Sequence, residues 1–172
     1  MQKGYVQVYT GNGKGKTTAM LGQAMRASGA GLRVYIGQFV KSMEYHEVSV
    51  IRNHLPNITI ELFGRGCTIA REVNEEDVLA AKEGVRKIKE VATSGKYDVV
   101  MLDEVNIAVY LKLLEVSEVL DVINAKPENV ELVLTGRYAA GEIVDAADIV
   151  TEMAEIKHYY IKGVEPRDGI ER

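Results

Sequence analysis

A glycine-rich loop near the N-terminus constrains the fold of this chain more than any other feature. Residues 5–9, YVQVY, alternate as a short strand; residues 10–18, TGNGKGKTT, form the loop; and residues 19–27, AMLGQAMRA, are typical of a helix. Glycines let backbone N–H groups wrap an anion without Cβ clashes, and a helix N-terminus adds a partial positive charge. The order strand, glycine loop, helix therefore predicts a phosphate-binding loop.

The loop departs from the general phosphate-loop pattern in one respect. The pattern G-x-x-x-x-G-K-[ST] requires glycine at position 10, where this chain has Thr10, and the first glycine comes one residue later, at Gly11. Lys16 is expected to neutralise phosphate oxygens, and Thr17 to offer its hydroxyl to Mg²⁺. The displaced glycine, together with Lys14 inside the loop, indicates that the polyphosphate need not be held as in an ordinary ATPase.

Composition limits the class of protein. The 172 residues, 47% of them apolar, fit a single domain spanning residues 1–172, and the formal net charge is −4. No run of five like charges occurs, so no nucleic-acid-binding surface is expected. No 18-residue apolar run and no export leader is seen, so we expect a cytoplasmic protein without a membrane segment. The single cysteine, Cys67, excludes an intramolecular disulfide, and the three histidines lack metal-ligand spacing.

Strand-like and helix-like segments alternate along the whole chain. After the first strand, further strands are expected over residues 32–36, 57–63, 97–104, 130–135 and 147–153. Beyond the first helix, residues 45–54 are compatible with a helix, and helices are expected over 75–93, behind an Asn74 cap, and over 114–124. This alternation predicts an α/β protein: a three-layer P-loop NTPase-like (RecA-like) fold with a mostly parallel sheet of about six strands.

Two acids end the predicted strand over residues 97–104, YDVVMLDE. Its continuous apolar run suits a strand buried on both faces, whose C-terminal end emerges beside the glycine loop. Asp103 and Glu104 can hold Mg²⁺ directly or through water, with Thr17 as a further oxygen ligand. The alternative is a carboxylate that caps a helix. The glycine loop upstream favours the metal site.

Two more segments are expected at the same edge of the sheet. Arg137 follows the strand over residues 130–135. We expect its guanidinium either to bind phosphate or ribose oxygens or, equally well, to pair with Asp103 or a neighbouring carboxylate. The loop of residues 64–71, GRGCTIAR, follows another strand and is either a ligand-binding loop or a plain connection. Cys67 alone is more typical of a small buried side chain than of a reactive thiol.

Together these motifs resemble those of the P-loop-type ATP:corrinoid adenosyltransferases. The loop TGNGKGKTT is the most specific part of the resemblance and explains the late glycine. The other matching segments are QFVK at 38–41, LDE at 102–104, LTGR at 134–137, AD at 147–148, TEM at 151–153, KH at 157–158 and GIE at 169–171. The resemblance runs from about Gly4 to the C-terminus.

The resemblance implies an enzyme in which a Co(I) corrinoid, of cobalamin or cobinamide type, attacks the 5′ carbon of ATP. A cobalt–carbon bond forms and triphosphate leaves. In this family the nucleotide lies reversed in the loop, so that the ribose points at the corrin. The resemblance also implies an electron donor such as a reduced flavoprotein, and a homodimer. Co(I) is itself a powerful nucleophile, so the absence of a general base agrees with this chemistry.

Roles for individual residues follow from the resemblance. ATP binding is implied for Gly11, Asn12, Gly13, Lys14, Gly15, Lys16, Thr17, Thr18 and Arg137. Metal binding is implied for Thr17, Glu104 and Asp103, and a catalytic role for Lys16, Thr17 and Glu104. The corrin is expected near Phe39, Lys41, Phe63, Gly66, Cys67 and Ile69. Its apolar face would lie on Phe39, Phe63 and Ile69.

The chain departs from better-known members in two places. Those members carry aromatic residues, which help displace the lower axial base from cobalt, where this chain has Cys67 and Ile69. They also carry an N-terminal extension over the corrin, so for this chain we expect that cover to be absent or to come from another subunit.

Two other functions stay open from the residues alone. A phosphotransferase or small ATPase would use Glu104 as base or water-positioning residue. A non-catalytic protein would bind the nucleotide or the corrinoid without turnover. A GTPase is not expected, because no Asn-Lys-x-Asp motif occurs.

Overall fold

The computed structural model describes residues 2–41, 43–65 and 72–171. In this part of the chain six parallel strands form one sheet, in the order β3-β2-β4-β5-β1-β6. The strands are β1 (Val6–Thr10), β2 (Val34–Phe39), β3 (Ile58–Phe63), β4 (Val99–Asp103), β5 (Glu131–Thr135) and β6 (Ile149–Glu152). The predicted α/β, P-loop NTPase-like fold with about six strands is therefore confirmed.

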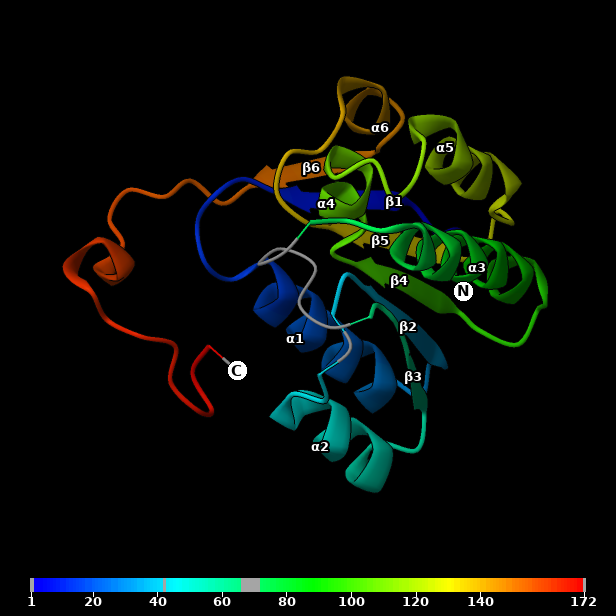
Figure 1. The fold of residues 1–172 in the computed structure, drawn as a ribbon. Coiled ribbons are helices and arrows are strands. Elements are labelled where there is room, and N and C mark those ends of the chain that lie inside the picture. Colours follow the sequence, from blue (N-terminus) through cyan, green and yellow to red (C-terminus); the bar gives the residue numbers. More distant parts are fainter. Residues whose placement is uncertain (1, 42, 66–71, 172) are drawn as a thin grey trace.

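Helices cover both faces of the sheet and complete three layers (Figure 1). α1 (Lys16–Gly29) and α2 (His46–His54) pack on one face. α3 (Glu75–Thr93), α4 (Val105–Tyr110), α5 (Val116–Ala125) and α6 (Gly141–Asp145) pack on the other. None of the helices in the described residues is long and apolar enough to cross a membrane.

The central strand β4 explains the apolar run in the sequence. Val100 and Leu102 belong to the core under α3, whereas Val99 and Met101 belong to the core under α1, and all four side chains are buried. Both faces of the strand need apolar side chains, because each is covered by a helix layer. Asp103, at the end of this strand, is therefore carried into a buried position at the edge of the sheet.

The predicted start of α3 is confirmed in detail. The Asn74 side chain accepts a hydrogen bond from the Asp77 N–H, and the Asp77 carboxylate accepts one from the Asn74 N–H, both at 3.0 Å. This reciprocal pair is a capping box, which satisfies two otherwise unpaired N–H groups. The predicted apolar face of the helix, which includes Val85 and Ile88, is buried against the sheet.

Four elements differ from the expectations. β2 continues to Phe39 instead of ending at residue 36, because it pairs with both β3 and β4 and so tolerates Gly37 within it. α4 and α6 were not expected, since six and five residues are too few to show a helical period. A 3₁₀ helix, η2 (Tyr159–Lys162), is also present near the C-terminus.

The chain after β6 runs outward from the sheet, forms η2 and returns toward the N-terminal end of α1 (Figure 1). Much of this segment is exposed, including the apolar side chains of Ile156 and Ile161 at 92% and 79%. β6 itself is an edge strand, and its Ile149 and Val150 are also exposed. The C-terminal segment therefore contributes little to the core, and its return brings residues 169–171 to the pocket that Lys16 and Thr17 line.

Candidate functional site

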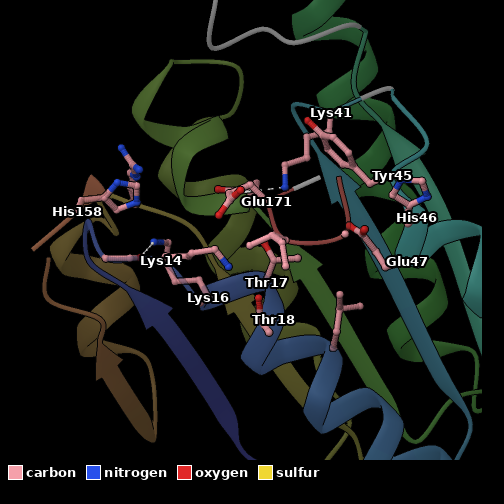
Figure 2. A pocket seen from close by; sticks show the side chains of 17 residues that line it. Lys14, Lys16, Thr17, Thr18, Lys41, Tyr45, His46, Glu47, His158 and Glu171 are labelled. Carbon is pink, nitrogen blue, oxygen red and sulfur yellow. Dashed lines mark hydrogen bonds and ion pairs between the residues drawn. The ribbon is translucent and has the colours of Figure 1, made fainter. Parts of the chain in front are cut away.

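The C-terminal ends of β1, β2, β4 and β5 meet at one edge of the sheet, where open α/β sheets bind ligands. A pocket of about 450 Å³ opens at this edge (Figure 2). It is lined by Gly13, Lys14, Gly15, Lys16, Thr17, Thr18, Leu21, Lys41, Tyr45, His46, Glu47, Glu104, Arg137, His158, Gly169, Ile170 and Glu171. The pocket thus combines the glycine loop with segments from four other parts of the chain.

Contacts with the segment after β6 explain why the first glycine of the loop comes late. Thr10 is the last residue of β1, and its hydroxyl accepts a hydrogen bond from the Ala139 N–H at 3.3 Å. Gly11 has a φ of 92°, and a Cβ there would lie 2.5 Å from the Met153 carbonyl oxygen. The Gly13 N–H donates to that same oxygen at 2.7 Å. Glycine is therefore required at position 11, while position 10 remains a strand residue.

Lys16 lies at the centre of the glycine loop. Its ammonium donates hydrogen bonds to the carbonyl oxygens of Gly11 and Gly13, at 2.7 and 2.8 Å, and the side chain is buried. Burial lowers the pKa of the Lys16 ammonium, an effect that the nearby carboxylate of Glu104 opposes. The loop thus holds a buried cation where a phosphate group is expected to bind.

Asp103 is the hub of the polar contacts beside the loop. One of its oxygens, Oδ1, accepts hydrogen bonds from the hydroxyls of Thr17 at 2.9 Å and Thr135 at 2.7 Å. The other, Oδ2, accepts one from the Gln38 amide at 3.1 Å and lies 4.0 Å from the Lys41 ammonium. These contacts satisfy a fully buried carboxylate. They also orient the Thr17 hydroxyl, whose oxygen lone pairs stay available to a cation.

Glu104 occupies the N-cap position of α4, but its side chain makes no capping hydrogen bond. The helix-cap alternative for this acid is therefore wrong. Its backbone is left-handed, with a φ of 60°, and its N–H donates to the Thr135 hydroxyl at 3.0 Å. Burial raises the pKa of the Glu104 carboxyl, the neighbouring Asp103 raises it further, and nearby cations, Lys41 first among them, oppose both effects.

Arg137 reaches the same pocket from the turn after β5. Its side chain is exposed, and within the described residues it forms no ion pair with Asp103. Of the two alternatives left open by the sequence, pairing with Asp103 is thus not observed. The guanidinium remains available for an anionic ligand.

The residues expected to contact a corrin do not form one common surface in the described part of the chain. Phe39 is fully buried and packs on Phe63, with 5.7 Å between the ring centroids. The expectation that Phe39 supplies an exposed apolar face is wrong in this structure, because β2 extends to it and buries it under α3. Lys41 lines the pocket with the glycine loop. Gly66, Cys67 and Ile69 lie outside the described residues.

Several pocket residues had no role assigned from the sequence. The start of α2 contributes Tyr45, His46 and Glu47, and the C-terminal segment contributes His158 and residues 169–171. The C-terminal residues belong to the matching motifs KH and GIE, which is the signal that pointed to them.

Gln38 and Thr135 are further residues without an assigned role, and both are buried against Asp103. Both belong to segments that match the family, QFVK and LTGR, which is the signal that could have found them.

Comparisons with known proteins identify the family of this chain. The family described as ATP:corrinoid adenosyltransferase BtuR/CobO/CobP matches residues 2–172. A corrinoid adenosyltransferase of Sinorhizobium sp is 35% identical over 173 residues, which cover 99% of this chain and 81% of the relative. Corrinoid adenosyltransferases of Escherichia coli (strain K12) and of Salmonella typhimurium (strain LT2) are each 33% identical over 171 residues, which cover 99% of this chain and 86% of the relative. The chain therefore belongs to the ATP:corrinoid adenosyltransferase family.

Proposed function

We propose that this protein transfers the 5′-deoxyadenosyl group of ATP to the Co(I) centre of a corrinoid and releases triphosphate. Family membership supports ATP-dependent adenosylation of corrinoids. The structural observation that carries the proposal is the buried Lys16 ammonium inside the glycine loop, near the hydrogen-bonded side chains of Thr17 and Asp103 and the carboxylate of Glu104. That arrangement suits a polyphosphate and its counter-cation.

Adenosyl transfer to Co(I) needs little acid or base catalysis from the protein. The cobalt electron pair forms a bond to C5′ of ATP, the C5′–O bond breaks, and its electron pair leaves on the triphosphate. No proton moves at the reacting carbon, so the work of the site is to position two substrates and to stabilise charge on the leaving group. Lys16, Arg137 and the N–H groups of the loop suit that second task. ATP contacts are proposed for Gly11, Asn12, Gly13, Lys14, Gly15, Lys16, Thr17, Thr18 and Arg137.

The residues beside the loop fit Mg²⁺. The Thr17 hydroxyl and the carboxylates of Glu104 and Asp103 are all oxygen donors, which this cation prefers. Glu104 and Thr17 line the pocket, whereas the Asp103 oxygens are already engaged by other side chains. We therefore propose Thr17 and Glu104 as direct ligands and Asp103 as the group that orients Thr17. When bound, Mg²⁺ would supply further neutralisation of the triphosphate charge.

The corrinoid is proposed to approach the open side of the pocket. Phe63 is partly buried at the end of β3 and backed by Phe39, and the segment that holds Gly66, Cys67 and Ile69 continues from there. Within this proposal the buried Phe39 packs behind Phe63 and does not itself contact the corrin. A cobalamin or cobinamide, and an electron donor such as a reduced flavoprotein, complete the reaction, which we place in the cytoplasm.

A homodimer is part of the proposal. Exposed apolar side chains on the edge strand β6 and on the C-terminal segment, Ile149, Val150, Ile156 and Ile161, support a contact with a second copy. Sedimentation of the wild type against an Ile156→Asp variant tests it, since a dimer that uses this face should dissociate at a higher concentration in the variant.

Anaerobic incubation with ATP, Mg²⁺ and chemically reduced Co(I) cobalamin tests the function. A light-sensitive alkyl-cobalamin spectrum together with triphosphate is the expected result. ADP and phosphate formed without a spectral change would replace the proposal by the phosphotransferase or ATPase alternative. Binding of ATP without either product would favour the non-catalytic alternative.

A further inference from the structure

Lys41 brings its ammonium to both carboxylates of the site. Its Nζ lies 3.8 Å from Glu104 Oε1 and 4.0 Å from Asp103 Oδ2, and the side chain is only 20% exposed. It points into the pocket beside Tyr45, with the ammonium 5.5 Å from the centre of that ring (Figure 2). The contacts belong to the nucleotide pocket, not to an apolar surface at the edge of the sheet.

The backbone around Lys41 is built to hold this position. Val40 has a φ of 68°, a conformation that β-branched residues rarely adopt, and the Lys41 N–H donates across it to the Phe39 carbonyl oxygen at 2.8 Å. Gly64 packs directly on the backbone of Lys41, so that a Cβ on Gly64 would lie 2.4 Å from the Lys41 carbonyl oxygen. Strain of this kind persists only where the surroundings enforce it. The direction of the Lys41 side chain is therefore imposed by the fold.

The two carboxylates need a positive charge between them. Asp103 is fully buried and the Glu104 side chain is 15% exposed, so water screens their mutual repulsion poorly. Lys41 supplies one ammonium near both. A divalent cation held by Glu104 would supply the same neutralisation from the pocket side, and the two positive charges would repel each other.

We propose that Lys41 is a positioning residue that holds the Glu104 and Asp103 carboxylates in the metal-free enzyme. When the divalent cation binds, it replaces the Lys41 ammonium as the partner of Glu104. The inference rests on the metal site of the proposed function. Lys41 thereby sets the affinity of the site for metal, so that the cation is bound firmly only when a triphosphate contributes further oxygen ligands.

Titration of the nucleotide-free protein with Mn²⁺, with the free ion measured by electron paramagnetic resonance, tests the role without any turnover. Lys41→Met keeps the apolar stem and removes the charge. The variant should bind Mn²⁺ about three- to tenfold more tightly than the wild type, because one nearby repulsive charge is gone. Lys14→Met is the matched control: Lys14 lines the same pocket, but it is exposed and forms no ion pair in the described residues, so its removal should change the affinity by less than about twofold.

Glu104→Gln tests the metal site separately from the role of Lys41. If it leaves Mn²⁺ binding unchanged, the ion does not bind at Glu104, and the metal site and the inference fail together. If it weakens binding while Lys41→Met gives no tightening, only the role of Lys41 is refuted.

Two further variants keep the test decisive if Lys41→Met does not fold. Gly64→Ala retains the ammonium but displaces the Lys41 backbone, and it should also tighten Mn²⁺ binding. Lys41→Arg retains a cation and should return the affinity toward the wild-type value. Tighter binding in Lys41→Arg, or none in Gly64→Ala, would overturn the inference.

Discussion

The Thr17 hydroxyl donates a hydrogen bond of 2.9 Å to Asp103 Oδ1, although the two residues lie on different elements, α1 and β4. The Thr135 hydroxyl binds the same oxygen at 2.7 Å from β5. Asp103 thus fixes the orientation of one hydroxyl that faces the pocket and of another that stays buried. The two threonines offer a way to separate metal binding from structural support.

Thr17→Val should raise the Mg²⁺ concentration needed for half-maximal activity, because it removes a hydroxyl ligand while Asp103 keeps its bond from Thr135. Thr135→Val should act mainly on stability, with a loss of about 1–2 kcal/mol, because it leaves the Glu104 N–H without its partner and the buried Asp103 Oδ1 with the Thr17 hydroxyl alone. Mg²⁺ titrations of the rate and urea unfolding measure the two effects. A larger Mg²⁺ shift in Thr135→Val than in Thr17→Val would contradict the assignment of Thr17 as ligand.

Lys16→Met should lower the rate by about 10²–10³-fold, since it removes a preorganised cation from the developing charge on the triphosphate. The fold should survive, because methionine keeps the apolar stem of the side chain, and Gly13, whose carbonyl oxygen is one of the two that the ammonium contacts, lines the pocket. Single-turnover rates and circular dichroism check the two statements. Turnover at the wild-type rate would remove the glycine loop from the mechanism.

The sequence was sufficient to predict that Asp103, Glu104 and Lys16 lie close together. Residues that end or follow the strands of a parallel sheet meet at one edge of that sheet. It could not place Gln38, since Gly37 resembles the end of a strand unless both neighbouring strands are known.

The direction of Lys41 was also inaccessible from the sequence. It depends on the positive φ of Val40 and on contact with Gly64, which is remote in sequence. A valine gives no signal for such a turn, because its local preference opposes it. Phe39 was misplaced for a related reason: the length of β2 is set by its partners in the sheet.

Gly11→Ala should destabilise the protein by about 1–3 kcal/mol, because alanine is strained at a φ of 92° and its Cβ would meet the Met153 carbonyl oxygen. Gly22→Ala is the matched control. It lies within α1 with no atom within 4 Å of the new Cβ, and it should stabilise the helix by about 0.5–1 kcal/mol. Urea unfolding of both variants measures these changes. A neutral Gly11→Ala would mean that contact with Met153 is not the reason for the late glycine.

The C-terminal return of the chain should depend on the ionised Glu171 carboxylate. Arg167 and the Tyr159 hydroxyl bind it and lower its pKa from 4.5 to about 2. Because the folded pKa is depressed, the stabilisation is complete above pH 4.5, declines as the pH falls, and is lost below about pH 2. Carboxyl chemical shifts of labelled glutamate, assigned with Glu171→Gln, should give this midpoint. A midpoint near 4.5 would mean that residues 167–171 do not hold this arrangement in solution, and that the pocket lacks its C-terminal wall there.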